Sequence, residues 1–118
     1  MLLLVVDHEF LYENMYATEG SIVTIHCHSS DSKSELVLWQ YRNFEELSVY
    51  DVYDGRSLIS DYANKCTIDD STYDLTIRNV EVSDAGIYWC IEDGGFGVKH
   101  ITKLYITGVY QCYIAVKL

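Results

Sequence analysis

The chain has 118 residues, which suffices for one domain with a hydrophobic core and leaves no room for a second. Hydrophobic residues make up 49% of it, with eleven tyrosines and no proline, a composition that excludes a disordered polar chain. The formal net charge of −10 would repel phosphate backbones and anionic lipid surfaces, so neither nucleic acid nor membrane is an expected partner.

Four cysteines stand at positions 27, 66, 90 and 112, and no pair has the C-x-x-C spacing of zinc or thioredoxin-like sites. Disulfides are therefore favoured over a metal, and no cofactor is expected. An even count suits a secreted or cell-surface protein, although the count alone leaves three pairings open.

The two ends of the sequence carry little information. Residues 1–6 are apolar but lack the basic region and cleavage site of a complete signal peptide. No window reaches the roughly 18 apolar residues of a membrane span, so any membrane attachment is expected outside this segment. We expect one domain over residues 1–108, followed at 109–118 by an extension or the start of a stalk.

The first clear strand is expected within residues 20–27. Apolar and polar side chains alternate there, which places Val23, Ile25 and Cys27 on one face, as in a half-buried strand. A polar serine-rich loop follows at residues 29–34.

Strand character resumes at residues 35–42, where Val37, Trp39 and Tyr41 share the inward face. Residues 48–55 then form a short strand that runs into an Asp-Gly turn, a strong hairpin signal.

A second hairpin is expected from residues 65–68 and 73–77, which flank a polar turn. The inward residues of this hairpin are Cys66, Ile68, Leu75 and Ile77.

The last two strands are expected at residues 85–91 and 100–106, joined by a glycine-rich loop. Their inward residues are Tyr88, Cys90, Thr102, Leu104 and Ile106. No stretch shows the apolar stripe of a helix, so the sequence predicts an all-β fold.

The spacing of a few residues is more specific than the strand pattern. Cys27 precedes Trp39 by twelve residues and Cys90 by sixty-three, and Tyr88 lies two positions before the second cysteine in Asp84-Ala-Gly-Ile-Tyr-Trp-Cys90. Over residues 17–107 this array resembles the variable-type immunoglobulin domain, a two-sheet antiparallel sandwich with Greek-key topology.

The resemblance implies roles for these residues. Cys27 and Cys90 would join the two sheets by a disulfide, against which Trp39 packs, and the Tyr88 hydroxyl would tie a corner of the chain to nearby backbone. Lys65 would pair with Asp84. The long interval between residues 39 and 65 leaves room for two additional strands, C′ and C″.

Within that superfamily, residues 21–27 and the Tyr-Trp-Cys ending resemble the polymeric immunoglobulin receptor and related leukocyte immune-type receptors. Phe96-Gly97 lacks the second glycine of the Phe-Gly-x-Gly motif, which disfavours a rearranged antigen-receptor chain. Cys66 could bridge Cys112 or stay free and buried, with Cys112 unpaired or linked to another chain; the sequence leaves both open.

Other constellations have simpler explanations. His26 and His28 lack a third ligand at a recognisable spacing, and the aspartates of the turns lack the spacing of a calcium loop. The glycines at 94–97 lead into a strand and not a helix, so they do not form a phosphate loop. No nucleophile motif is present, and no enzymatic activity is expected.

The resemblance instead implies a protein-binding module outside the cell. Strand alternation sends Trp89 outward, either under a neighbouring segment or into an interface. Loops at residues 29–35, 50–57 and 92–100 would cluster at one end of the sandwich. The candidate ligand-binding residues are Tyr50, Asp51, Tyr53, Asp54, Trp89, Glu92, Asp93 and Phe96.

Aromatic anchors mixed with carboxylates favour a protein ligand that carries a basic patch. The leading hypothesis is the ectodomain of an immune-type cell-surface receptor. A homotypic adhesion or oligomerising domain, with the chain as a homodimer, and a secreted or viral decoy are the alternatives.

Overall fold

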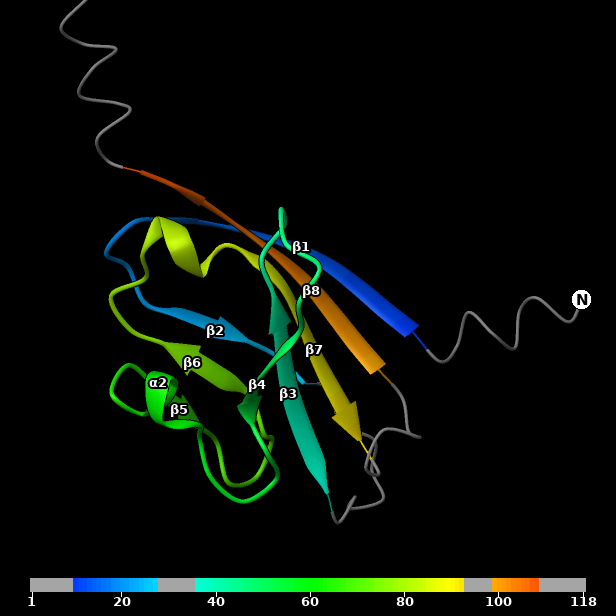
Figure 1. Ribbon diagram of the computed structural model, residues 1–118. Helices are drawn as coiled ribbons and strands as arrows, with labels where there is room; N and C mark the ends of the chain where they lie inside the picture. The colour runs from blue at the N-terminus through cyan, green and yellow to red at the C-terminus, as the bar shows by residue number, and fades with distance from the viewer. Residues whose placement is uncertain (1–9, 28–35, 93–98, 109–118) are drawn as a thin grey trace, which may run out of the picture.

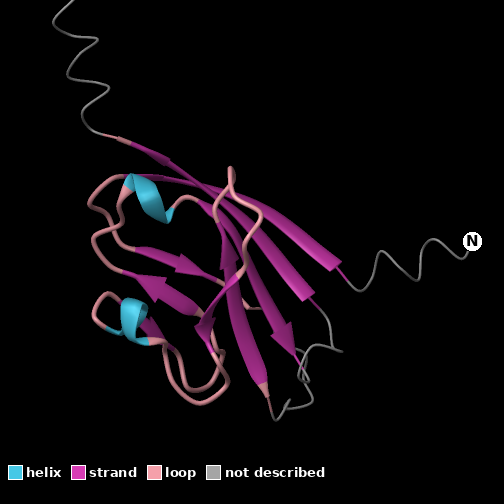
Figure 2. Cartoon of the chain, viewed as in Figure 1, coloured by secondary structure: helices cyan, strands magenta, loops and turns pink. Residues whose placement is uncertain are grey.

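The computed structural model describes residues 10–27, 36–92 and 99–108, which form two packed β-sheets (Figures 1 and 2). Helix is limited within these ranges to one α-helical turn, α2 (Ser60–Ala63), and one 3₁₀ turn, η1 (Val82–Asp84). Neither is long and apolar enough to cross a membrane. The all-β sandwich expected from the sequence is confirmed.

The larger sheet, called the front sheet below, has the strand order β1-β8-β7-β3-β4. Its strands are β1 (Phe10–Thr18), β8 (Lys99–Thr107), β7 (Gly86–Glu92), β3 (Val37–Arg42) and β4 (Tyr50–Tyr53). β1 pairs in parallel with β8 along one edge (Figure 1), whereas the other three pairs are antiparallel.

The smaller sheet, called the back sheet, has the order β2-β6-β5 and is antiparallel throughout. Its strands are β2 (Val23–Ile25), β6 (Leu75–Ile77) and β5 (Cys66–Ile68). The hairpin expected from residues 65–77 is therefore present, as strands β5 and β6.

The core lies between the sheets and is filled by every second residue of their strands, as the alternation predicted. Each fully buried aliphatic or aromatic side chain stabilises such a core by about 1.5 to 3 kcal/mol relative to an exposed one. The most deeply buried members are Ile25, Cys27, Val37, Trp39, Val52, Leu75, Ile77, Val80, Cys90 and Leu104. Ile22 precedes β2, lies on the face opposite to that of Val23 and Ile25, and is 67% exposed.

A disulfide and a tryptophan join the two sheets at the centre of this core. Cys27 and Cys90 are bonded across a sequence separation of 63, as the resemblance implied. Trp39 is fully buried, and its indole Nε1 donates a hydrogen bond to the Tyr73 carbonyl at 2.8 Å. The bond satisfies the one polar atom of a side chain that otherwise packs against apolar groups.

The corner before β7 is held by three short hydrogen bonds. The Tyr88 hydroxyl donates to the Asp84 carbonyl at 2.6 Å. Lys65 Nζ donates to Asp84 Oδ2 at 2.8 Å, and the Glu81 amide donates to the same oxygen at 2.8 Å. Because Lys65 immediately precedes β5, its ion pair with Asp84 ties the back sheet to the corner that leads into the front sheet.

The interval between β4 and β5 does not contain the expected C″ strand. β4 supplies the C′ strand, but after the turn at Gly55 the chain makes a single bridge, between Tyr53 and Leu58, and then enters α2. Leu58 and Tyr62 pack against the core from this segment. Their burial against the core takes the place of edge pairing, so the segment leaves the sheet.

Cys66 is 2% exposed and forms no disulfide with another described residue, while Cys112 lies outside the described ranges. Burial, with a smaller contribution from the Asp84 carboxylate, raises the pKa of the Cys66 thiol from 9.0 to about 11. The folded state therefore holds this proton more tightly than the unfolded chain does.

This difference predicts a loss of stability in alkaline solution. The stabilisation by the protonated Cys66 thiol is fully present below pH 9. It falls as this thiol ionises in the unfolded chain, and about 2 to 3 kcal/mol has been lost near the folded-state pKa. Urea titrations at pH 8, 9 and 10 should show a steeper fall in the wild type than in a Cys66→Ala variant, because the buried tyrosines contribute equally to the fall in both proteins. A Cys66→Ala variant that retained the same slope would contradict the assignment.

Candidate functional site

One row of side chains crosses the outer face of the front sheet. The register places Tyr12 beside Ile101, Ile101 beside Trp89, Trp89 beside Gln40, and Gln40 beside Asp51. Because directly paired residues share a face of a sheet, all five project from the same side. The row is apolar over β1, β8 and β7 and becomes polar, then acidic, over β3 and β4.

A second group of exposed side chains on this face is aromatic. The rings of Tyr16 and Tyr105 stack with centroids 5.1 Å apart, and Phe44 stacks on the other side of Tyr105 at 5.1 Å. Tyr16 is 74% exposed, and Leu47, in the loop after Phe44, is 91% exposed. Ring stacking fixes these side chains without burying them, so they form a rigid apolar surface.

The outer face of the back sheet is different in character. Thr24 and Thr76 face each other and share a hydrogen bond of 3.0 Å, and His26 Nδ1 lies 3.0 Å from Asp74 Oδ2. Thr67 of β5 is exposed. Short polar side chains that bond to one another make this face a solvated surface, so the apolar exposure of the sheets is concentrated at the front.

A shallow hollow of about 160 Å³ lies beside this row of side chains, lined by Gln40 and Trp89 of the row together with Val49 and Ile91. Trp89 is only partly buried, so the outward direction expected for its side chain agrees with its position here. Gln40 Nε2 donates a hydrogen bond of 3.1 Å to Asp51 Oδ1 at the edge of the sheet.

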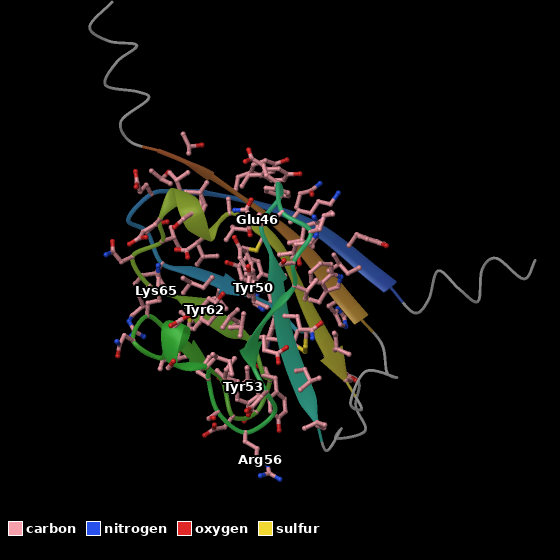
Figure 3. The ribbon with its side chains drawn as sticks, in the orientation of Figure 1. Glu46, Tyr50, Tyr53, Arg56, Tyr62 and Lys65 are labelled. Atoms are coloured by element: carbon pink, nitrogen blue, oxygen red, sulfur yellow. A yellow bond between two sulfur atoms is a disulfide. The ribbon has the colours of Figure 1, made fainter. Side chains whose placement is uncertain are left out.

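Among the side chains that the structure describes, two cations also lie on this face. Arg42 donates a hydrogen bond of 2.6 Å to the carbonyl of Glu46, in the loop that Figure 3 shows above β4. Lys103 is exposed on β8. The surface therefore carries charges of both signs around its apolar centre.

The candidates on β4 divide into two groups (Figure 3). Tyr50 is 48% exposed at the start of the strand, and Asp51 is exposed beside Gln40. Tyr53 instead packs partly against the core, and burial is the main reason that the pKa of its hydroxyl is raised. Tyr50 and Asp51 are available for contact, whereas Tyr53 is only partly so.

Asp54 is exposed, but it shapes the turn after β4. Its Oδ1 accepts hydrogen bonds from the backbone amides of Ser57 at 3.0 Å and Arg56 at 2.9 Å, which lower the pKa of its carboxyl group. Gly55 has a positive φ of 101°, as the Asp-Gly turn predicted. Figure 3 shows Arg56 at the tip of this turn.

Glu92 is not the exposed loop group that we expected. It is the last residue of β7, is 2% exposed, and pairs with Val37. The alternation that turns Tyr88 and Cys90 inward also turns Glu92 inward, and the glycines that follow led us to start the loop one residue too early. Asp93 and Phe96, with most of the loops at 29–35 and 92–100, lie outside the described residues.

The part of this surface that β1 supplies was not predicted from the sequence. Tyr12 and Tyr16 belong to β1, which begins at Phe10, whereas the resemblance begins only near residue 17. The sequence did contain a signal for this strand, because Tyr12, Asn14 and Tyr16 alternate with Met15 and Ala17, which pack against the core. Gln40 and Val49 carried no such signal, because only the pairing of distant strands brings them beside Trp89.

The acidic turns have structural roles. Asp69 Oδ1 accepts hydrogen bonds from the backbone amides of Ser71 and Thr72, at 2.7 and 2.9 Å, as Asp54 does in its own turn. Within residues 10–27, 36–92 and 99–108, no group of three or more histidine, cysteine or acidic side chains is placed to hold a metal ion.

Comparisons with known proteins agree with this architecture. The extracellular domain of the voltage-gated sodium channel beta4 subunit has 18% identity and a TM-score of 0.64, over 82% of this chain and 86% of its own. The CD2-binding domain of CD58 has 22% identity and a TM-score of 0.59, over 81% of this chain and 54% of that one. No curated protein sequence matches. An immunoglobulin domain family model matches residues 11–93, and the chain therefore belongs to the immunoglobulin domain family.

Proposed function

We propose that this domain is an extracellular protein-recognition module, the ligand-binding part of an immune-type cell-surface receptor, and not an enzyme. It binds a protein partner through the outer face of the front sheet, with the turn at residues 50–57 and the loops at 29–35 and 92–100 at the border. The parallel pairing of β1 with β8 and the presence of β4 support a variable-type domain.

The observation that carries this proposal is the difference between the two outer faces. The front sheet exposes Tyr12 at 70% and Tyr16 at 74%, and the loop between β3 and β4 exposes Leu47 at 91%, whereas the outward side chains of the back-sheet strands are threonines. Concentrated apolar exposure on a rigid surface is typical of protein-binding sites. Tyrosine and tryptophan provide large contact areas at a low cost in side-chain entropy.

The charge of the chain supports a partner with a basic surface. The net charge is −10, and the exposed carboxylates of Asp51 and Asp54 lie at the β4 edge of the proposed site. Such a field accelerates encounter with a positively charged partner at low ionic strength and repels an acidic one.

The test uses the partner that the tetramerised domain captures from an array of purified cell-surface ectodomains. Trp89→Ala and Tyr12→Ala are each introduced and the dissociation constant is measured by surface plasmon resonance. At least one should weaken binding about five-fold or more, because truncating a central aromatic anchor costs more than about 1 kcal/mol.

Ile22→Ala is the matched control, because Ile22 is 67% exposed just before β2 of the back sheet. It should leave the affinity unchanged. If both front-sheet variants bind normally while Ile22→Ala or other back-sheet changes abolish binding, the proposed site is wrong. Circular dichroism of each variant establishes that the fold is intact.

A homotypic function is the second candidate, supported by the charges of both signs on the front sheet. In a two-fold dimer, Lys103 of one copy could face a carboxylate such as Asp51 of the other. A domain of the same fold, that of the sodium channel beta4 subunit, is described as a parallel homodimer with a role in cell–cell adhesion. A stable dimer in light scattering at micromolar concentration, dissociated by Trp89→Ala, would favour this function over the receptor.

A further inference from the structure

We propose that the hollow beside Trp89 receives one arginine side chain of the partner protein, with its guanidinium group between the indole ring and the Asp51 carboxylate. The inference rests on the proposed function and specifies the chemistry of the partner at one point. It follows from the lining of the hollow, the hydrogen bonding of its polar edge and the charges around it.

The lining combines an aromatic ring with the Gln40 amide, which is hydrogen-bonded to the Asp51 carboxylate on the neighbouring strand. Val49, Trp89 and Ile91 supply apolar contacts, and Gln40 leads from them to Asp51 on the next strand. A cation near the face of an indole ring is attracted by the negative electrostatic potential of that face. The Asp51 carboxylate lies two strands from Trp89, with Gln40 between them, and adds a second attraction, so the two groups favour the same kind of ligand.

The polar edge is better suited to accept hydrogen bonds than to donate them. A carboxylate only accepts, so the Gln40 amide nitrogen must face Asp51 to form their bond of 3.1 Å. This leaves Gln40 Oε1 and Asp51 Oδ2 as acceptors. In the parts of the chain that the structure describes, Asp51 has no ion pair, because the pairs found there join His26 with Asp74 and Lys65 with Asp84.

The two cations of this face whose side chains the structure describes leave that role open. Arg42 projects from the same strand as Gln40, but its guanidinium donates to the carbonyl of Glu46 at 2.6 Å. Lys103 pairs in register with Ile87, one row away from Trp89. Neither lines the hollow.

Other ligand groups fit less well. A carboxylate or phosphate would be repelled by Asp51. An apolar side chain would remove the Gln40 and Asp51 oxygens from water without replacing the lost hydrogen bonds. A lysine would satisfy the charge, but the planar guanidinium group of arginine also stacks on an aromatic ring and donates several hydrogen bonds in one plane.

The first experiment uses Nα-acetyl-arginine amide as the probe and follows the indole N–H signals of the folded domain by NMR. Its neutral isostere, Nα-acetyl-citrulline amide, is titrated at the same ionic strength. The arginine probe should shift the Trp89 signal about five-fold more than the citrulline probe, because only the cation gains the ring and carboxylate attractions. The buried Trp39 signal is the internal control and should not move.

Two variants then test whether the Asp51 carboxylate attracts the arginine probe. Asp51→Asn should reduce the arginine-induced shift of Trp89 to half or less, while Asp61→Asn, the same change on an exposed residue of α2, should leave it unaltered. Equal shifts with arginine and citrulline, or an unchanged response in Asp51→Asn, would overturn the proposal. Both variants alter exposed side chains, so loss of folding does not obscure the result.

The two proposals can fail separately. If the captured partner is weakened by Trp89→Ala but binds Asp51→Asn with unchanged affinity, the front sheet remains the binding site and the arginine contact is wrong. If the arginine probe responds as expected while front-sheet changes leave the partner unaffected, the chemistry of the hollow stands and the proposed function is wrong.

Discussion

Removing the Cys27–Cys90 disulfide should lower the free energy of unfolding by about 4 kcal/mol, because the bond closes a loop of 63 residues in the unfolded chain. That is a large share of the 5 to 15 kcal/mol that typically stabilises a domain. Both sulfur atoms are fully buried against Trp39, so the paired Cys27→Ala and Cys90→Ala changes also leave a small cavity in the core.

Urea denaturation followed by tryptophan fluorescence measures this effect in the double variant and in the wild type with and without a reductant. The reductant should destabilise the wild type and leave the double variant unchanged. Cys66→Ala serves as the control, because Cys66 is buried outside the disulfide and its loss should not alter the response to reductant. A double variant within about 1 kcal/mol of the wild type would contradict the importance of the bridge.

Substituting alanine for Gly86, the first residue of β7, should cost about 2 to 5 kcal/mol, the sum of backbone strain and steric overlap. Gly86 has a φ of 152°, a conformation that other residues rarely adopt. An added Cβ would collide with the carbonyl oxygen of Arg42 and lie 2.7 Å from Cε1 of Tyr41. Neither can withdraw easily, because Arg42 ends β3 and the Tyr41 hydroxyl is bonded to the corner.

Gly20→Ala separates the two contributions. Gly20 also has a positive φ, 92°, but a Cβ there would meet no atom within 4 Å. It should therefore show only the strain, about 1 to 2 kcal/mol. Thermal denaturation of both variants provides the comparison, and equal midpoints for Gly86→Ala and Gly20→Ala would show that the predicted collision is relieved.

Much of the fold could be predicted because its signals are local or have fixed spacing. Alternation over a few residues places Val23 and Ile25 in the core, and the spacing of Cys27, Trp39 and Cys90 implies the disulfide that the structure contains. The Asp54-Gly55 turn was predicted from two residues. These features depend on backbone preference and on which face of one strand a side chain occupies.

The candidate site was predicted only in part, because it depends on the pairing of strands far apart in the sequence. Trp89 was expected to face outward, but nothing near it in the sequence indicates that Gln40 and Val49 lie beside it. The missing C″ strand has a similar cause. Whether the segment after Gly55 pairs at the edge or folds back as α2 depends on core contacts made by Tyr62, which a local pattern does not reveal.

The pairing of β1 with β8 has a consequence for the order in which the molecule assembles. Phe10 pairs with Lys99, so the two strands of this edge are separated by 99 − 10 = 89 residues along the chain. Contacts between such distant segments form slowly, because a long loop must close before they contribute any stability. On the ribosome, β1 emerges first and must wait for nearly the whole domain to be synthesised. Until then the exposed edges of β1 and β7 are available to pair with other chains, which favours aggregation of the nascent domain.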